Sequence, residues 1–580
     1  MLETTGVAVD AALIEGWRTR AELARAHLGW WAPGTCARSH TGGATLAVAA
    51  PWDQLFVATE VNEWALCATL RAADPGHWGS LEPLLLAAAL ENAADPATLT
   101  PPVLEEQAAF ERFTRLAAAE ARPALRSLLA AAARRDLPYV LDDETLTLGT
   151  GAGGCDFALE ALPAESAVPW AALSGVPTAL VTGSNGKTTT VRLLAACARA
   201  HGWHAAYNCT DGVYLDGELL DAGDYSGPLG ARRVLRERRA RAALIETARG
   251  GILRRGLAMS SATAAVVTNV SADHFGEYGI DGLEALADVK LTVAAVLGER
   301  GLLVLNADDA LLRARAPRLT ERYGRTPALG WFALADEAAP LAAHRAAGGA
   351  TCAVRAGRLL LSMGGAAHDL GAIAAMPLTV DGSATYNVAN LAGAALAAAA
   401  LGIAPATIAA VYAHFGGAPA DNPGRLMRYE LDGVRVLIDY AHNPEGLRGL
   451  LAVAQHLRTS DGRLGLILGH AGNRQDADIE ALAEVAAAAG PELIVVKENE
   501  AHLRGREPGE IPRLLRAVLL RAGFAPATLP LRPSELEAVR CALEWARPGD
   551  VLALPVHSAA ARTAVLEMLS ARSAHCSRSR

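Results

Sequence analysis

The sequence predicts an α/β protein of three parts, and three observations support this prediction. First, the apolar, β-prone run at 178–182 enters a turn with two glycines, and a helical pattern follows at once. Second, strand-like apolar runs alternate with helical stretches over 166–415 and again over 416–580. Such alternation predicts mostly parallel sheets that are covered by helices and that bind ligands at the ends of their strands. Third, residues 1–165 lack this alternation and predict a separate N-terminal α+β domain.

The N-terminal region is rich in alanine and leucine, which predicts helices. Within it, residues 44–66 are predicted to form a pair of strands, and residues 137–154 resemble short β-strands. Its aromatic residues are expected in a core and not on a binding platform; they are Trp30, Trp31, Trp52 and Trp64.

The turn at 183–189 has the layout of a phosphate-binding loop. Two glycines let the backbone turn tightly, so that its N–H groups can face a phosphate chain. Lys187 supplies a cation for the outer phosphates, and the Thr188 hydroxyl is placed to ligate Mg²⁺. The alternative is a glycine-rich turn in an alanine-rich protein, against which the Lys-Thr-Thr run argues. The predicted nucleotide-binding residues here are Gly183, Ser184, Asn185, Gly186, Lys187, Thr188 and Thr189.

Polar residues follow other predicted strands of the central region. Glu246 ends one strand and is suited to ligate Mg²⁺ directly or through water. Taken singly, each such residue has a structural alternative: Glu246 as a surface residue, His274 as a capping or satisfied core histidine. Because they follow a phosphate loop in this order, the functional interpretation is favoured. The residues at the ends of the two further strands are Asn269, Asp273 and His274, and Asn306, Asp308 and Asp309.

The region 416–580 is predicted to be a smaller, Rossmann-like α/β unit. It begins with the Gly- and Pro-rich segment 416–425, which predicts a hinge. The motif Asp-Tyr-Ala-His-Asn-Pro at 439–444 follows a predicted strand. As a strand-to-helix turn it would place Asn443 as the helix cap and Pro444 in the first helical position.

Composition limits the function classes. The net charge of −9 and pI of about 6.0 give no electrostatic footprint for nucleic acid. The start of the chain lacks the features of a signal peptide, and no uncharged apolar run is long enough to span a bilayer. Eight scattered cysteines without a Cys-x-x-Cys pair predict reduced thiols, not disulfides or a zinc site. We therefore expect a cytoplasmic protein without nucleic-acid or membrane partners; homo-oligomer formation stays open.

Several motifs resemble those of the Mur ligase superfamily, whose members join an amine to a carboxylate at the expense of ATP. They are Thr-Gly-x-Asn-Gly-Lys-Thr-Thr at 182–189, Asn-x-Ser-x-Asp-His-x-Gly at 269–276 and the motif at 439–444. Residues 246–257, 497–510 and 548–556 look more specifically like the Mur-type half of cyanophycin synthetases, and 51–66 and 134–154 resemble their N-terminal domain.

In those synthetases an ATP-grasp module separates the N-terminal and Mur-type parts. Here only residues 155–177 lie between the two resembling regions. We therefore expect this chain to lack the activity that extends an aspartate backbone, and to be unable to polymerise alone. The predicted domains are 1–165, a central ATP-binding domain at 166–415 and a C-terminal domain at 416–580.

The resemblance implies a mechanism and roles. ATP would phosphorylate the acceptor carboxylate, and the amine would attack the resulting acyl phosphate. Thr188 and Glu246 would hold one Mg²⁺, and His274 a second. Lys290 matches a lysine that is often carbamylated and then serves as a ligand of the second metal; the alternative is an ordinary helix-surface lysine. Asn387 and Asn390 match an Asn-x-x-Asn helix start, although either could cap that helix, and Asn306 is a candidate for adenine contact.

In the C-terminal region the resemblance assigns Arg425 to the phosphates and Asp439 to the ribose, with His442 near the phosphates or the amine. Because these ligands are split between domains, we expect closure about the hinge to assemble the site. The segment 502–507 occupies the place where Mur ligases recognise the incoming amino acid. Glu498 and Glu500 could face a cationic side chain, and Arg504 or Arg506 a carboxylate; the alternative is a solvated, mixed-charge face.

Two alternatives to a cyanophycin-synthetase-like ligase stay open. One is a different Mur ligase, of the folylpolyglutamate-synthase or peptidoglycan-precursor type. The other is a catalytically silent nucleotide-binding partner protein, against which the intact residues argue; these are Lys187, Thr188, Glu246, His274, Lys290 and Arg425.

Overall fold

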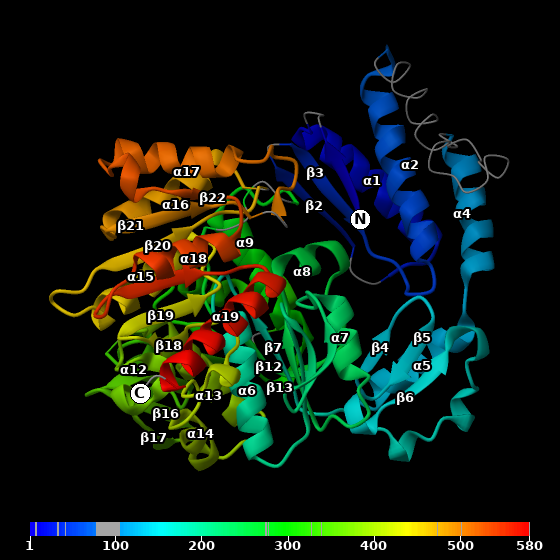
Figure 1. Ribbon diagram of the computed structural model, residues 1–580. Coiled ribbons are helices and arrows are strands. Elements are labelled where there is room, and N and C mark those ends of the chain that lie inside the picture. The colour runs from blue at the N-terminus through cyan, green and yellow to red at the C-terminus, as the bar shows by residue number, and fades with distance from the viewer. Residues whose placement is uncertain are drawn as a thin grey trace.

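Four β-sheets organise the part of the chain that the computed structural model describes. It describes residues 1–578 except 6–8, 32–33, 41, 77–104, 273–274, 276–277, 326, 338, 473 and 500–501. Figure 1 shows the N-terminal segments in blue and cyan on one side of a green central body and the C-terminal segments in yellow to red on the other. The α/β fold class predicted from the sequence is confirmed.

The central sheet has eleven strands in the order β10-β9-β8-β11-β7-β12-β13-β14-β15-β16-β17. Its middle is parallel, and antiparallel strands close both edges. The parallel strands are β7 (Thr178–Thr182), β8 (Ala205–Cys209), β11 (Ala242–Glu246), β12 (Ala262–Val267), β13 (Leu297–Asn306), β14 (Ala328–Ala333) and β15 (Ala350–Arg355). The edge strands are β9 (Gly212–Leu215), β10 (Glu218–Ala222), β16 (Arg358–Met363) and β17 (Ala366–Ala372).

Successive residues of these strands enter two different cores. In β7, Ala179 and Val181 pack in one core and Leu180 in the other, because side chains alternate across a sheet. One core lies under α6 (Lys187–Ala200), α13 (Thr385–Ala400) and α14 (Pro405–Tyr412). The other lies under α7 (Pro228–Leu235), α8 (Arg249–Arg255), α9 (Leu283–Lys290), α10 (Ala310–Arg315), α11 (Leu319–Tyr323) and α12 (Ala339–Ala346). Burial on both faces explains why the strands are continuous apolar runs.

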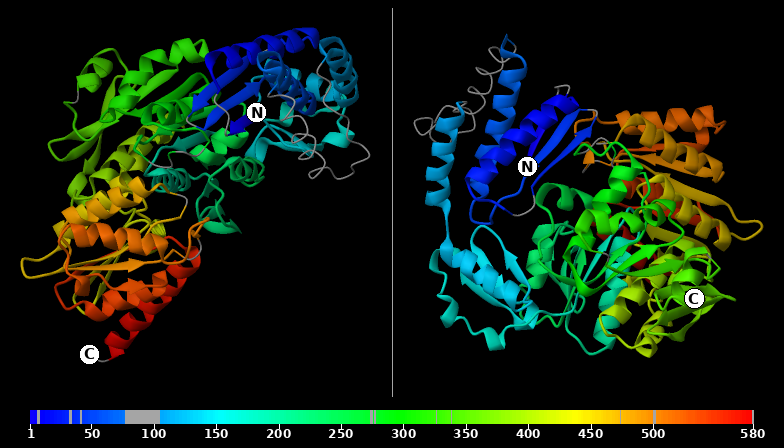
Figure 2. Two further views of the ribbon diagram at one scale, coloured as in Figure 1. Left: turned by 90° about the horizontal axis from the view of Figure 1, so that it is seen from above. Right: turned by 180° about the vertical axis from the view of Figure 1, so that it is seen from behind.

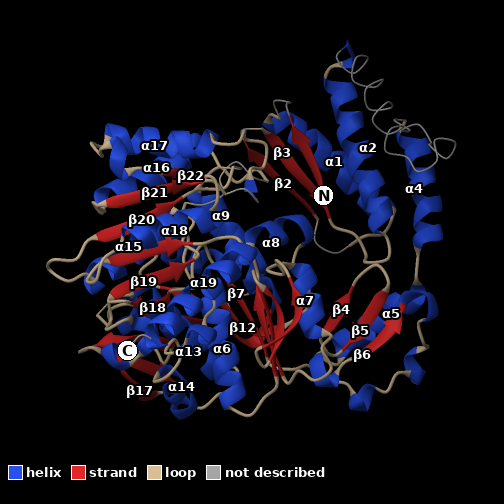
Figure 3. Cartoon of the chain, viewed as in Figure 1, coloured by secondary structure: helices blue, strands red, loops and turns tan. Residues whose placement is uncertain are grey.

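The C-terminal sheet has six strands in the order β18-β19-β23-β20-β21-β22, with only β18 antiparallel. They are β18 (Met427–Leu431), β19 (Val434–Asp439), β20 (Leu464–Leu468), β21 (Leu493–Lys497), β22 (Leu531–Arg532) and β23 (Val551–Pro555). Three helices cover one face, namely α15 (Pro444–Leu457), α16 (Asp476–Ala488) and α17 (Glu510–Arg521). The other face is covered by α18 (Glu535–Trp545) and α19 (Ala559–Arg578). Figure 3 sets these helices, in blue, apart from the strands, in red.

The N-terminal region forms two small cores. In the first, the sheet β1-β3-β2 packs with three helices; these elements are β1 (Leu2–Thr5), β2 (Thr35–His40), β3 (Gly43–Val48), α1 (Ala11–His27), α2 (Leu55–Ala73) and α4 (Glu106–Glu120). In the second, the sheet β4-β5-β6 packs with one helix; these are α5 (Pro123–Arg134), β4 (Tyr139–Leu141), β5 (Thr145–Leu148) and β6 (Cys155–Ala158). Figure 2 shows the helices and strands of this region, in blue and cyan, from two other directions.

Two expectations for this region were wrong. The second half of 44–66 is part of helix α2, because Val57, Val61 and Trp64 lie at helical spacing and bury one face against the first core. Of the four tryptophans expected in a core, Trp30 and Trp64 are buried. The other two do not lie in a core, since 86% of Trp31 and 54% of Trp52 is exposed.

The connections agree with the predicted order of the parts, although the exact domain boundaries stay predictions. Residues 159–177 lead from β6 directly to β7. Residues 413–426 lead from α14 to β18 and contain the predicted hinge. Of the helices that the structure describes, none combines the length and the apolar character needed to cross a membrane.

Candidate active site

The loop between β7 and α6 depends on its two glycines. Gly183 has a φ of +146°, and a Cβ atom there would lie 1.8 Å from Thr268 Oγ1. Gly186 has a φ of +86°, and its Cβ would lie 2.1 Å from Asn390 Oδ1. Any side chain at either position would be strained and would collide with a neighbour. The two glycines therefore let the backbone turn tightly at this point, as the sequence predicted.

The segment that follows β12 lies beside this loop and forms hydrogen bonds with it. The backbone N–H of Ser184 donates to the Asn269 carbonyl at 3.0 Å, and that of Asn185 donates to Asn269 Oδ1 at 2.9 Å. The Thr268 hydroxyl donates to the Asn185 carbonyl at 2.6 Å. Asn269, at the end of the second predicted strand, is thus a support of the loop.

Lys187, Thr188 and Glu246 meet at the carboxyl ends of β7 and β11. Lys187 Nζ donates to the carbonyls of Gly183 and Ser184, both at 3.0 Å. The Thr188 hydroxyl donates to Glu246 Oε2 at 2.8 Å. Burial raises the pKa of Glu246, while the Lys187 charge, the Thr188 hydrogen bond and Arg425 oppose that rise. A buried carboxylate beside a hydroxyl and two cations marks a candidate binding site for a charged ligand.

Arg425 reaches the loop from the segment 416–425, the predicted hinge. Its Nη2 lies 3.4 Å from Thr188 Oγ1, and its guanidinium stacks on the Tyr440 ring at 4.2 Å. Asp439 ends β19 and accepts from the Leu426 N–H at 2.7 Å. Burial raises the pKa of Asp439, and Arg425 opposes this rise. Arg425 and Asp439 therefore lie close together, and their predicted roles at the nucleotide stay predictions.

The start of α15 also contacts the loop directly. Asn443 Nδ2 donates to Asn185 Oδ1 at 2.9 Å, and Asn185 Nδ2 donates to Glu445 Oε2 at 3.3 Å. Asn443 Oδ1 caps the helix by accepting from the Gly446 N–H at 2.8 Å, so the motif forms the strand-to-helix turn that the sequence predicted, and its nucleotide contacts stay a prediction. His442 Nδ1 lies 3.1 Å from the Tyr440 carbonyl. A carbonyl only accepts, so in the neutral ring the proton is on Nδ1 and Nε2 is the acceptor.

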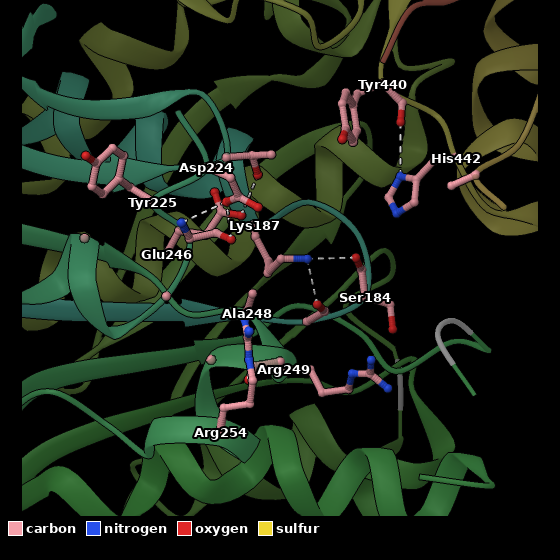
Figure 4. A pocket seen from close by; sticks show the side chains of 18 of the residues that line it. Ser184, Lys187, Asp224, Tyr225, Glu246, Ala248, Arg249, Arg254, Tyr440 and His442 are labelled. Carbon is pink, nitrogen blue, oxygen red and sulfur yellow. Dashed lines mark hydrogen bonds between the residues drawn. The ribbon is translucent and has the colours of Figure 1, made fainter. Parts of the chain in front are cut away.

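Two cavities meet at the loop. The larger, about 900 Å³, lies between the central and C-terminal parts. The smaller, about 140 Å³, is lined by the loop, the start of α13 and the end of β19. Residues shared by both cavities are Ser184, Lys187, Thr210, Glu246, Tyr440 and His442. Figure 4 shows Lys187 with Ser184, Glu246 and Asp224 around it, and Tyr440 and His442 on the C-terminal side.

The larger cavity is rich in cations, most of which sequence reasoning did not assign. The aromatic ring of Tyr278 lies beneath Arg249 and Arg254, at 6.0 and 5.8 Å from their guanidinium carbons. Both arginines belong to the segment 246–257, which resembles cyanophycin synthetases, but the sequence predicted no role for them. The described cations that line it are Lys187, Arg249, Arg254, Arg255, Lys290, Arg474 and Arg504, and the acids are Asp224 and Glu246.

Other predicted residues are placed as follows. Lys290 ends α9, is 3% exposed and lines the larger cavity, so it is not a helix-surface lysine. Asn387 and Asn390 are buried inside α13 and do not cap it; both line the smaller cavity. Asn306 donates to the Thr268 carbonyl at 3.0 Å and lines neither cavity, so its adenine contact stays a prediction without a supporting contact.

The predicted amine-selecting segment divides into two groups. Arg504, with His470, Arg474, Asn499 and His502, lines the larger cavity. By contrast, Arg506 pairs with Asp476 and Glu510. Glu498 accepts from the Gly509 N–H at 2.6 Å. It therefore stabilises its own segment, 498–509, and does not line the larger cavity. Asp273, His274 and Glu500 lie outside the described residues.

The donors around the loop suit a hard cation. No three His, Cys, Asp or Glu side chains converge as a metal site within the described part of the chain. Magnesium, however, commonly uses one carboxylate with hydroxyl, water and phosphate oxygens. The hydroxyls of Thr188 and Thr210 lie 2.8 and 3.2 Å from the two oxygens of Glu246, which fits that preference.

Comparisons with known proteins match both α/β parts. Residues 181–350 match the family described as the Mur ligase middle domain, and residues 424–554 match the Mur ligase, glutamate ligase domain. The cyanophycin synthetase of Nostoc sp. is 36% identical over 340 residues, which are 59% of this chain and 37% of that protein. The UDP-N-acetylmuramoyl-L-alanyl-D-glutamate–2,6-diaminopimelate ligase of Geobacter metallireducens is 28% identical, over 66% of this chain and 73% of that protein.

Among solved structures, Escherichia coli FolC in complex with DHPP and ADP aligns with a TM-score of 0.50 and 19% identity. The alignment covers 68% of this chain and 89% of that one, and it shows a shared fold. The chain spans little more than a third of the cyanophycin synthetases that it matches.

Proposed function

This chain belongs to the Mur ligase family, and we propose that it is an ATP-dependent ligase that joins an amino-acid amine to a carboxylate acceptor and forms ADP. Members of the family named among its relatives are ligases or synthetases. More finely, we propose a cyanophycin-synthetase-like ligase that does not polymerise alone. The direct connection from β6 to β7 by residues 159–177 supports this, because an ATP-grasp domain has no place there.

One observation carries the proposal: the phosphate loop lies where the two cavities meet. A nucleotide in the smaller cavity would contact Asn387, Asn390 and Asp439 and would direct its terminal phosphate to Lys187. The larger cavity begins at the same lysine and has room for an acceptor and an amine. Its excess of arginines suits a substrate that carries carboxylates.

The reaction follows from these positions. The acceptor carboxylate oxygen attacks the γ-phosphorus, and the bond from that phosphorus to ADP breaks. Lys187 and Arg425 neutralise the charge on the transferred phosphoryl group. The amine nitrogen then attacks the carbonyl carbon, and the bond from that carbon to the phosphate oxygen breaks. His442, which lines both cavities, would accept the proton that the amine loses.

A magnesium ion fits the hydroxyl and carboxylate donors of this site. Thr188 and Glu246 would hold it, and the ion would supply charge neutralisation between the outer phosphates. We further propose that Lys290 helps to hold a second ion in carbamylated form, for which its burial at the cavity wall is the support.

The test is phosphate release from Mg·ATP with pooled amino acids and pooled carboxylate acceptors, including aspartyl peptides. We expect release that requires both pools, and a product whose mass is the sum of the substrates minus water. Lys187→Ala, folded but without its phosphate cation, is the background and should release none. ATP binding without release from any pool would favour the silent nucleotide-binding partner instead.

A further inference from the structure

The chain has three lysines among its 53 basic residues, and all three lie at the larger cavity or directly behind its wall. Lys187 and Lys290 line the cavity, and Lys497 lies behind His557, which also lines it. Lysine differs from arginine in its compact ammonium with three N–H donors. The third lysine has no part in the proposed reaction.

Lys497, at the end of β21, is fully buried. Its Nζ donates to a Glu535 carboxylate oxygen, to the Pro555 carbonyl at 2.7 Å and to His557 Nδ1 at 3.4 Å. These three acceptors account for the three N–H groups of an ammonium. A buried charge with every donor satisfied is stable and holds its neighbours in one arrangement.

This arrangement fixes the proton of His557. Its Nε2 lies 3.0 Å from the Ala441 carbonyl, so Nε2 carries the proton and donates, while Nδ1 accepts from Lys497. Burial and then the Lys497 charge lower the pKa of His557 to about 3, which keeps the ring neutral. Glu535 accepts from the backbone N–H groups of His557 and Ser558 at 3.0 and 2.8 Å. Since both ring nitrogens are engaged, His557 is not the base of the reaction.

The segment that His557 holds is the turn from Tyr440 to His442. Besides bonding to Ala441, the His557 ring meets the Tyr440 ring edge-on, with centroids 5.4 Å apart. The same tyrosine contacts His442 at 5.3 Å and lies beneath Arg425 at 4.2 Å. Movement of this turn would displace Tyr440 from beneath Arg425, which contacts Thr188, and would shift His442 in the wall of both cavities.

We propose that His557, oriented by Lys497 and Glu535, is a positioning residue of the ligase reaction, which holds the Tyr440–His442 turn against the phosphate loop through its Nε2–H. The inference rests on the proposed function for its catalytic consequence. Its structural consequence, the support of Arg425, also bears on nucleotide binding and is measurable without turnover.

Two substitutions of His557 test separately the contribution of its N–H donor and that of its ring. His557→Phe keeps a ring but has no N–H, whereas His557→Gln keeps an N–H donor on a flexible chain. We expect His557→Phe to lower kcat about 100-fold, since a small misplacement of reacting groups has an effect of that order. We expect His557→Gln to recover most of that loss, and Mg·ATP binding by calorimetry to weaken about tenfold in the Phe variant and less in the Gln variant.

His456→Ala, an exposed histidine of α15 away from the cavities, is the matched control and should behave as the wild type. Melting temperatures show that each variant is folded. Wild-type kcat and ATP affinity in His557→Phe, or equal losses in the Phe and Gln variants, would overturn the positioning role. If the wild type makes no product from any pool, the ligase proposal fails, and the ATP affinities of the two variants decide the positioning role by the same pattern.

Discussion

Two carboxylates near the phosphate loop have pKa values shifted in opposite directions. At Glu246 burial outweighs Lys187, and its pKa is raised. At Asp211 burial is outweighed by Arg425, Arg192 and Arg562, and its pKa is lowered. Asp211 accepts from Arg192 of α6 at 2.7 Å and from Arg562 of α19 at 2.6 Å. It therefore joins the phosphate-loop helix to the last helix of the chain.

Asp211→Asn is predicted to destabilise the protein near neutral pH. Its loss leaves two nearly buried arginines without their acid, which costs about 3 kcal/mol. Because the folded-state pKa lies below the ordinary value of 3.8, this stability is fully present above that value and is lost as pH falls through the folded-state pKa. The difference in urea midpoint between wild type and variant should thus be large at pH 7 and shrink in acid. An equal difference at all pH values would contradict this account.

Lys290→Ala is predicted to be almost inactive while it remains folded. Lys290 lies in the wall of the larger cavity, where the proposed carbamate would supply an anionic ligand. Added acetate or formate should then restore part of the phosphate release, because a small carboxylate can enter the space that the side chain leaves. Full activity without any addition would remove Lys290 from the site.

At the residue scale, a residue of the candidate site could be predicted from the sequence where it lies in a local motif. Gly183, Lys187 and Thr188 follow one strand, and Glu246 ends another, so their meeting follows from a parallel sheet. Asp211, Arg562 and His557 could not be predicted, because the contacts from Asp211 to Arg562 and from His557 to Ala441 join segments more than a hundred residues apart and no short pattern marks them. Glu498 accepts a hydrogen bond from the Gly509 N–H, and Arg506 pairs with Glu510. These contacts, and not a substrate, explain where the two side chains lie.

At the scale of elements, strand β2 of the N-terminal region supports the cavity without lining it. None of the described residues of 1–165 lines the larger cavity. Arg38 of β2, however, donates to the carbonyl of Tyr278, whose ring lies under Arg249 and Arg254. Next to it, Gly279 has a φ of +64° and packs on His40, where a Cβ would lie 2.2 Å from the imidazole.

Arg38→Ala is therefore predicted to weaken substrate binding in the larger cavity and to leave nucleotide binding unchanged. We expect the KM of the acceptor to rise about tenfold, a loss of ~1.4 kcal/mol, with an unaltered Kd for Mg·ATP. Arg18→Ala, on the exposed side of α1, is the matched control. An unchanged acceptor KM would show that β2 does not set the cavity wall.

The elements of the two α/β parts were predictable because their apolar runs alternate with helices. The N-terminal region was harder, since Val57 and Val61 suggest a strand by composition but lie at helical spacing. Propensity is a weak guide when packing decides, and the packing partners of α2 lie in α1, β3 and α4.

At the scale of the whole molecule, the proposed site is assembled from two parts that meet across the larger cavity. The phosphate loop and α8 come from the central part, and Arg425, His442 and Arg504 from the C-terminal part. Contacts from Asn185 to Asn443 and from Asp211 to Arg562 hold the two together. Since neither part has the complete set, we expect the Gly- and Pro-rich connection at 416–425 to act as the hinge on which substrates enter and the site closes.

The most direct test of the central claim follows one oxygen atom. An acceptor labelled with ¹⁸O in its carboxylate is incubated with Mg·ATP and the amine that the pooled assay identifies, and the released phosphate is analysed by mass spectrometry. We expect each phosphate to carry one ¹⁸O from the acceptor and the ADP to be unlabelled, because the carboxylate oxygen leaves with the phosphoryl group. Unlabelled phosphate, or label recovered in AMP, would contradict the acyl phosphate and with it the proposed reaction.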